Sequence, residues 1–230
     1  MIKRVILSFF PLDTRRGRAL KGVAAKLQLA HPPLYDHDFV FWTAHKEKDV
    51  FAMLRSNFPD DVSPRFSIVI PTYNTAEKYL QPLIYSLVNQ TYDNWEVIIT
   101  DGSPDEESAQ LIEQYCKQDE RIKYHHNNTK GISANTNHGL KFVKGKYIVF
   151  VDHDDILDLH ALNELATVID EEGAPDIIYS DEDKISDNGT LRHSPHFKPD
   201  WAPHQFLSCN YTNHISAVYR DWETDRKSVV

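Results

Sequence analysis

Cysteine and long apolar runs are both scarce in this sequence. The 230 residues include only two cysteines, Cys116 and Cys209, which lie far apart and match no metal-ligand spacing. We therefore expect free thiols in a reducing compartment, which favours the cytoplasm. No uninterrupted apolar stretch approaches the roughly 20 residues that a membrane-spanning helix needs. These absences argue against a disulfide-stabilised domain and against a transmembrane segment.

Positive charge and glycine are also in short supply. The chain has 25 Lys and Arg against 34 Asp and Glu, a formal net charge of −9, so we expect no nucleic-acid partner held through its phosphates. Only 8 glycines occur, and neither a GxGxxG nor a GxxxxGK phosphate loop is found. A bound diphosphate would therefore need something other than a glycine-rich cradle. Length and a 41% hydrophobic content still predict a substantial core.

The first 62 residues differ in texture from the rest. The opening 30 residues carry seven Lys and Arg against one acid, Asp13, and a turn-rich linker then leads to a second helical pattern. We predict a helical, basic extension over residues 1–62. It is either a solvated basic helix or a segment that makes peripheral contact with the inner face of the cell membrane.

From Phe66 onward the sequence alternates regularly between apolar runs and helical patterns. Strands are predicted at 66–70, 95–100, 122–126, 146–151 and 175–180, with helices at 76–90, 105–118, 133–143 and 159–173. Near-continuous apolar strands separated by helices are typical of a parallel sheet covered on both faces. The predicted fold class is therefore α/β, with a mostly parallel Rossmann-like sheet flanked by helices over residues 63–220.

Polar and acidic residues follow four of the predicted strands. They are Pro71-Thr72-Tyr73, Asp101-Gly102-Ser103, Asp152-His153-Asp154-Asp155 and Asp181-Glu182-Asp183. Ligands of such sheets bind beyond the carboxyl ends of the strands, where these residues should meet. Several carboxylates at one rim are costly unless a pKa rises or a cation neutralises them. Oxygen ligands suit Mg²⁺ or Mn²⁺, so we predict a metal that holds a diphosphate.

These motifs, in this order, resemble those of family 2 glycosyltransferases with the GT-A fold. FSIVIPTYN, VIITDGSPD and the strand followed by VDHDD carry the resemblance, which covers roughly residues 66–220. The later stretch IIYSDEDKISDNG, with HFKPDWAPHQFLSCNYTNHISAVYR, is similar to the branch that builds bacterial surface polysaccharides. The resemblance implies an inverting, metal-dependent transfer of sugar from a UDP- or dTDP-sugar to a glycan or lipid-linked acceptor.

The resemblance also implies roles for individual residues. Pro71, Thr72 and Tyr73 would line the base pocket, with Asp101 accepting a hydrogen bond from the base, Asp152 contacting the ribose, and Asn135 contacting the donor. Asp154 would ligate the metal, with Asp155 beside it. Asp181, Glu182 and Asp183 would face the donor sugar or the acceptor. Trp201 either stacks on a sugar or packs in the core.

The end of the chain departs from the family pattern. The acidic motif that usually supplies the catalytic base is not found, so we expect the acceptor side to be incomplete and the base to be missing. Residues 221–230 are expected to be a non-native tail, because DRKSVV can be back-translated to a sequencing-adapter run. Two alternatives stay open: an inactive nucleotide-sugar-binding fragment, and a phosphoaspartyl hydrolase with Asp152 as nucleophile and Asp154 as acid.

Overall fold

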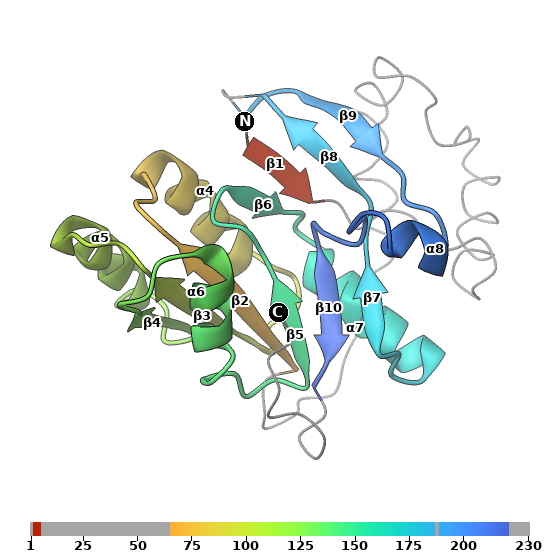
Figure 1. Ribbon diagram of the computed structural model, residues 1–230, viewed down its shortest axis with the longest axis horizontal. Coiled ribbons are helices and arrows are strands. Elements are labelled where there is room, and N and C mark those ends of the chain that lie inside the picture. The colour runs from red at the N-terminus through yellow and green to blue at the C-terminus, as the bar shows by residue number, and fades with distance from the viewer. Residues whose placement is uncertain (1, 6–64, 187–188, 221–230) are drawn as a thin grey trace.

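A six-stranded sheet forms the centre of the protein (Figure 1). The computed structural model describes residues 2–5, 65–186 and 189–220. The strands of this sheet are β2 (Phe66–Thr72), β3 (Trp95–Asp101), β4 (Ile122–His126), β5 (Tyr147–Phe150), β7 (Ile177–Tyr179) and β10 (Ser216–Tyr219). Their spatial order is β4-β3-β2-β5-β10-β7, in which β2, β3, β4 and β5 pair in parallel and β10 is antiparallel to both neighbours. The mostly parallel sheet predicted from the sequence is thus confirmed.

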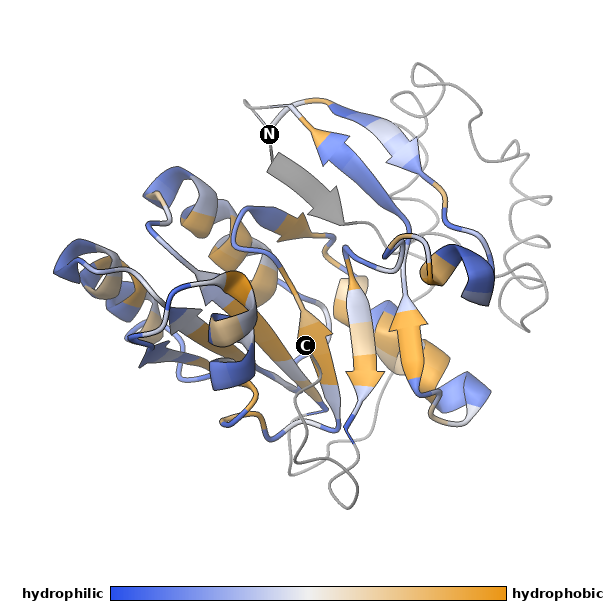
Figure 2. Cartoon of the chain, in the orientation of Figure 1, coloured by the Kyte–Doolittle hydropathy of each residue, from blue (hydrophilic) through white to orange (hydrophobic). Residues whose placement is uncertain are grey.

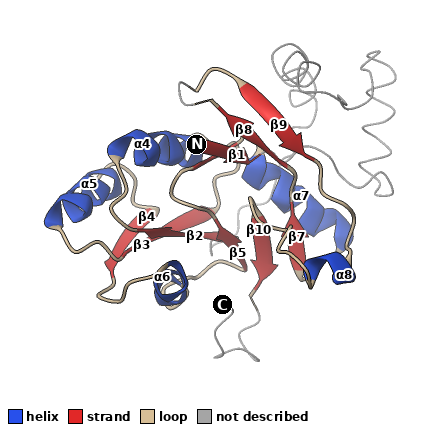
Figure 3. Ribbon diagram, turned by 45° about the horizontal axis from the view of Figure 1, so that its top comes forward, coloured by secondary structure: helices blue, strands red, loops and turns tan. Residues whose placement is uncertain are grey.

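Helices cover both faces of this sheet, as the apolar strands predicted. They are α4 (Glu77–Val88), α5 (Glu106–Cys116), α6 (Ile132–Gly139) and α7 (Ala161–Glu172). Figure 3 shows α6 on one side of the sheet and α4 and α5 on the other. Side chains alternate accordingly: Ile68 packs in the large core with α4 and α7, whereas its neighbour Val69 packs in a smaller core beside α6. Both β2 and β3 are buried along their whole length.

Local sequence signals explain where α5 begins and where α7 ends. The side chain of Asp105 caps α5 by accepting a hydrogen bond from the backbone N–H of Ser108 at 3.0 Å. Glu106 and Glu107 then lie in the first turn, where the helix dipole favours acids. Gly173 ends α7 in the left-handed region, with φ of 76°, a conformation that glycine adopts without strain.

A second, smaller sheet lies against the end of the large one (Figures 1 and 2). Its order is β6 (Asp155–Leu157), β1 (Ile2–Val5), β8 (Glu182–Ile185) and β9 (Arg192–His196). In Figure 2, β8 and β9 are largely hydrophilic, which is why the apolar alternation did not predict them. A short helix, α8 (Pro203–Phe206), precedes β10. None of the helices in the described ranges is long and apolar enough to cross a membrane.

The predicted N-terminal helix is wrong for the four residues of that region that the structure describes. Ile2–Val5 is a strand, parallel to β6 and antiparallel to β8. The remainder of the predicted extension, residues 6–62, and the predicted non-native tail at 221–230 lie outside the described residues. Their assignments stay predictions.

Gly145 offers a test of the turn that leads into β5. A Cβ at this position would lie 2.6 Å from the backbone nitrogen of Ser67 and 2.7 Å from the carbonyl carbon of Phe66. Because backbone atoms of β2 cannot move aside, Gly145→Ala should lower the free energy of unfolding by about 1–3 kcal/mol or more. Urea denaturation measures this loss. Lys144→Ala is the control, because its exposed side chain should change stability by no more than about 0.5 kcal/mol. Equal stability of the two variants would contradict the close approach.

Candidate functional site

The carboxyl ends of β2, β3 and β5 bring most of the predicted residues to one rim of the sheet. The pairs Thr72 with Asp101 and Ser216 with Phe150 mark this rim, because β2 and β3 end at it and β10 begins at it. Ser216 also pairs with Tyr179, so β7 ends at the same place. Residues from five strands and the loops that follow them therefore converge here, as expected for the ligand-binding edge of an α/β sheet.

Asp101 is the centre of a buried hydrogen-bond cluster. Its Oδ1 accepts from Thr72 Oγ1 at 3.0 Å, from Ser103 Oγ at 2.6 Å and from the backbone N–H of Ser103 at 3.2 Å. Its Oδ2 is buried and has no hydrogen-bond partner among the described residues. A buried carboxylate oxygen without a donor is costly, so it marks a position that a ligand N–H can fill.

The chain beside Asp101 presents an exposed aromatic ring. Pro71 is buried, whereas the next residue but one, Tyr73, is 43% exposed. Asn74 follows in the left-handed region with φ of 49°, and its backbone N–H donates to Ser103 Oγ at 2.7 Å. The turn after β2 is thereby fastened to the turn after β3, and the Tyr73 side chain lies at the surface next to this junction.

Asn135, predicted to contact the donor, is buried and holds the two turns together. Its Nδ2 donates to the carbonyl of Thr72 at 3.0 Å, and its Oδ1 accepts from Asn127 Nδ2 at 2.8 Å. A Cβ on Gly102 would lie 2.8 Å from Asn135 Nδ2, so only glycine leaves room for this amide. These contacts make Asn135 a support for the rim, and its contact with a donor stays a prediction.

Asp152, Asp155 and His214 form a group that has the geometry of a metal site. One potential ligand atom from each lies within 4.8 Å of the others. His214 Nδ1 lies 2.8 Å from Asp155 Oδ2 and 3.9 Å from Asp152 Oδ2. Asp155 Oδ1 is buried and has no hydrogen-bond partner in the described part of the chain. Asp154 is half-buried and stands outside this group, so its predicted role as ligand is not part of the observed cluster.

Burial and mutual attraction determine the electrostatics of this group. Burial raises the pKa of Asp155 above its ordinary value, although its hydrogen bond to His214 opposes the shift. For His214, burial alone would lower the pKa, but the hydrogen bond and the charge of Asp155 raise it. A bound cation would compete with protons for these ligand atoms, because carboxylates and imidazoles ligate a metal in their deprotonated forms.

The three acids of the Asp181-Glu182-Asp183 stretch have different surroundings. Asp183 is buried and forms an ion pair with Arg192 at 2.5 Å, so it belongs to the small sheet. Glu182 lies 3.2 Å from His196 Nδ1. Asp181 accepts a hydrogen bond from the backbone N–H of Lys198 at 2.7 Å. Burial raises the pKa of Asp181 to about 6. Their predicted contacts with sugar or acceptor stay predictions.

Two residues of the site were missed in the sequence, His214 and Lys198. The ammonium of Lys198 is buried and donates to the carbonyls of Asn213 and His214, with Glu182 Oε2 at 3.8 Å. Burial lowers the pKa of Lys198, against the attraction of Glu182. Neither residue stands in a local motif, because 59 positions separate His214 from Asp155. Only the insertion of β10 between β5 and β7 brings them to the rim.

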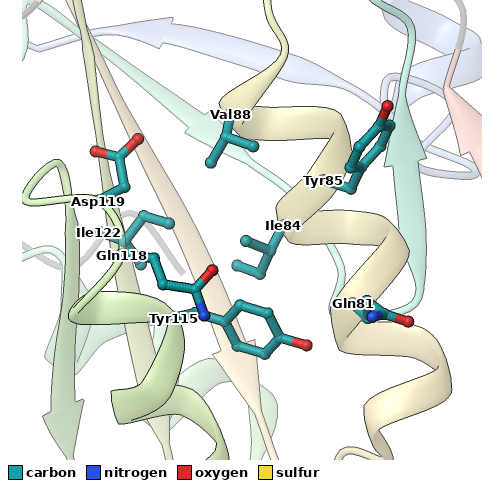
Figure 4. A pocket seen from close by; sticks show the side chains of 8 residues that line it. All are labelled: Gln81, Ile84, Tyr85, Val88, Tyr115, Gln118, Asp119 and Ile122. Carbon is teal, nitrogen blue, oxygen red and sulfur yellow. The ribbon is translucent and has the colours of Figure 1, made fainter.

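A cavity elsewhere in the molecule does not belong to this site. It has a volume of about 330 Å³ and lies between α4 and the end of α5 (Figure 4). Its lining residues are Gln81, Ile84, Tyr85, Val88, Tyr115, Gln118, Asp119 and Ile122. Because Val88 ends α4 and Ile122 begins β4, this cavity faces the amino ends of the strands.

The raised pKa of Asp181 predicts a specific pH dependence of stability. The carboxyl of Asp181 binds its proton more tightly in the folded state than in the unfolded state. The free energy of unfolding should therefore fall as the pH rises from about 4 to about 6. Asp181→Asn keeps an oxygen for the Lys198 N–H but cannot ionise. Relative to the parent, its free energy of unfolding should rise across this window, by at most about 3 kcal/mol, and stay level above it. Urea denaturation between pH 4 and 8 measures the difference.

The control for this experiment is Asp200→Asn, which removes an exposed carboxylate from the neighbouring segment. It measures what the same substitution does at an exposed position. If the difference between Asp181→Asn and the parent did not change across this pH window, Asp181 would ionise in the folded state as it does in the unfolded chain.

Comparison with known proteins identifies the family. The model of Glycosyl transferase family 2 matches residues 67–221. An uncharacterized protein of Sinorhizobium fredii is 38% identical over 154 residues, which cover 66% of this chain and 17% of that protein. The O-antigen biosynthesis protein RfbC of Myxococcus xanthus is 30% identical over 160 residues, 69% of this chain and 12% of that protein. This chain thus spans less than a fifth of either relative.

Among solved structures, S. aureus TarS 1-349 in complex with UDP-GlcNAc is 32% identical, covering 50% of this chain and 33% of that one, with a TM-score of 0.46. The family model matches more than half of the chain and spans all of the rim residues described above. The protein therefore belongs to glycosyltransferase family 2.

Proposed function

We propose that this protein transfers a sugar from a UDP- or dTDP-sugar, with a divalent cation at the rim that Asp152, Asp155 and His214 form. The observation that carries the proposal is that this group and the buried Asp101 oxygen, which has no partner among the described residues, stand at the same edge of the sheet, where β3 and β5 end on either side of β2. One cluster suits a diphosphate-bound cation and the other suits a base N–H. Because the chain belongs to glycosyltransferase family 2, the phosphoaspartyl hydrolase that the Asp-x-Asp spacing suggested is no longer a candidate.

The surroundings of Asp101 favour uracil or thymine. Three donors converge on its Oδ1, so Oδ2 is the oxygen left for a ligand. Uracil and thymine carry an N3–H that can donate to it, whereas the N3 of cytosine is an acceptor and would be repelled. The exposed ring of Tyr73 offers a face on which the base can stack, next to Pro71 and Thr72. Asn135 supports this pocket from behind through the Thr72 carbonyl.

The donor set at the acidic exit of β5 fits a divalent cation. Two carboxylates and one imidazole nitrogen are within reach of a single ion, and a buried carboxylate oxygen of Asp155 lacks another partner among the described residues. The imidazole of His214 favours Mn²⁺ over Mg²⁺, which prefers oxygen ligands alone. When bound, the cation would neutralise the diphosphate of the leaving nucleotide. Asp154, on the same turn, is proposed from the sequence as a further ligand.

The proposed reaction is a direct displacement that inverts the anomeric carbon. A hydroxyl of the acceptor, a glycan or a lipid-linked glycan of the cell surface, would attack while the nucleoside diphosphate leaves. Asp181 and Glu182 are the residues proposed to face the sugar or the acceptor. Both contact Lys198, which in turn donates to the carbonyl of His214. Asp183 is left out of this proposal because it is buried in an ion pair with Arg192. No described residue is assigned as the base; donor binding without turnover is therefore the second candidate function.

The proposed setting is the cytoplasmic side of the cell envelope. The relative named for O-antigen biosynthesis supports a role in surface polysaccharide synthesis. Peripheral membrane contact through the basic N-terminus rests on residues outside those described, apart from Ile2–Val5.

The metal site is tested by thermal unfolding with UDP, with and without Mn²⁺. UDP at about 100 times its dissociation constant should stabilise the parent by about 2.7 kcal/mol, and most of this should require the metal. His214→Ala and Asp152→Asn should each lose the metal-dependent part, compared with their own ligand-free midpoints. His204→Ala removes an exposed histidine of α8 and should keep the full effect. Loss in Asp154→Ala with retention in His214→Ala would overturn the role of His214.

Base selection is tested by converting Asp101 to Asn. Because Thr72 and Ser103 hold the oxygen side, the amide NH₂ should occupy the Oδ2 position and present a donor. Affinity for UDP should fall about tenfold to a hundredfold, and affinity for CDP should rise. Calorimetric titration of both nucleotides measures the switch. Asp93→Asn, an exposed carboxyl at the other end of β3, should bind as the parent does. An equal loss for UDP and CDP would mean that Asp101 only supports the fold.

A further inference from the structure

A group of exposed apolar side chains lies between β9 and β10, and we name it the aromatic rim. It consists of Phe197, Trp201, Phe206 and Leu207. Trp201 is 53% exposed, so of the two roles considered for it in the sequence, packing in the core is wrong. Its ring lies 5.2 Å from that of Phe206, centroid to centroid, with the planes inclined at 45°. Exposed aromatic rings grouped in this way mark binding surfaces more often than isolated ones do.

The segment that carries the aromatic rim is fixed to the end of β7. Tyr179 Oη donates to the carbonyl of Pro199 at 2.8 Å, and the backbone N–H of Ala202 donates to Tyr211 Oη at 2.9 Å. The rings of Tyr179 and Tyr211 meet edge to face at 5.5 Å, and Phe206 packs on Tyr211 at 6.2 Å. Trp201 is therefore presented on a supported backbone, which reduces the entropy lost when a ligand stacks on it.

The same segment is continuous with the proposed donor site at both ends. Near its start, the backbone N–H of Lys198 donates to Asp181, and at its other end stands His214, which lies close to Asp152 and Asp155. The ammonium of Lys198 closes this loop by donating to the carbonyls of Asn213 and His214. Figure 1 shows α8 at the end of the sheet where β7 ends and β10 begins. A molecule stacked on the aromatic rim would thus lie at the same end of the sheet as the proposed donor site.

We propose that the aromatic rim binds a pyranose ring of the glycan acceptor, with Trp201 as the stacking face. This inference rests on the proposed function and names the acceptor class of that site. A pyranose has an apolar C–H face that suits an aromatic ring and hydroxyls at its edge that need polar neighbours. Such neighbours are at hand, because Asp200, His204 and Asn210 are exposed on the same segment. The aromatic character and the carboxylate of Asp200 favour a sugar over an anionic lipid surface.

The test is saturation-transfer NMR with a panel of methyl glycosides in the presence of UDP and Mn²⁺. The panel comprises hexoses, N-acetylhexosamines and deoxyhexoses. At least one glycoside should receive saturation from the parent protein, and Trp201→Ala should lower its affinity about twofold to tenfold. Trp201→Phe should restore most of the signal, because it keeps an aromatic face. Tyr85→Ala, which removes an exposed ring from α4, is the matched control and should leave the signal unchanged.

The outcomes separate this inference from the proposed function. Thermal stabilisation of Trp201→Ala by UDP and Mn²⁺ should equal that of the parent, because Trp201 belongs to the acceptor side. If UDP stabilises the protein but no glycoside binds at up to about 0.1 M, or binds Trp201→Ala equally well, the aromatic rim is not a sugar site. Co-sedimentation with vesicles containing a polyprenyl phosphate is the remaining arm. Binding there that depends on Trp201, without glycoside binding, would overturn the proposal in favour of a lipid surface. Loss of the UDP effect in the parent would instead defeat the proposed function.

Discussion

The antiparallel insertion of β10 between two strands of the sheet is the constraint on which the candidate site depends. Ser216 pairs at once with Phe150, the last residue of β5, and with Tyr179, the last residue of β7. This register places His214 above the rim, 2.8 Å from Asp155. A slip of one residue would turn the side chains of β10 to the opposite face and separate the histidine from the carboxylates. The grouping of His214 with Asp155 therefore depends on the pairing of β10 with β5, two strands that are far apart in the sequence.

Most of the acids at this rim have their own partners in the protein, so no single cation is required to offset all of their charges. Asp183 forms an ion pair with Arg192, Asp155 is hydrogen-bonded to His214 at 2.8 Å, and Asp101 accepts hydrogen bonds from the hydroxyl groups of Thr72 and Ser103. Asp181 has no such ionic partner at hydrogen-bond distance in the described chain, and its raised pKa is the result. Burial raises the pKa of a carboxyl, and a partner such as His214 beside Asp155 opposes that shift without removing it. The cation proposed above would act at the exit of β5, where Asp152 and Asp154 are half-buried and Asp152 Oδ2 lies 3.9 Å from His214 Nδ1.

The sequence predicted the parallel core because its signals are local. Each apolar run of β2, β3 and β5 and each amphipathic helix could be recognised within about a dozen residues, and the polar residues that end these strands followed from the topology rule. The polar strands β8 and β9 carry no apolar alternation, and β10 joins the sheet out of sequence order. His214 and Lys198 were missed for this reason. The N-terminal helix was predicted where Ile2–Val5 pairs as a strand, an instance of tertiary pairing overriding local propensity.

Lys198 joins the two halves of the site into one structural unit. Its backbone holds Asp181, and its ammonium holds the carbonyls that flank the approach to His214. Removing this buried ammonium would leave the carbonyls of Asn213 and His214 without their donor, which costs more than losing a surface ion pair. The ring of Trp201, in contrast, is more than half exposed and lies 5.2 Å from that of Phe206. Lys198 therefore holds the backbone next to His214 in place, whereas the outer side of the same segment faces solvent at Trp201.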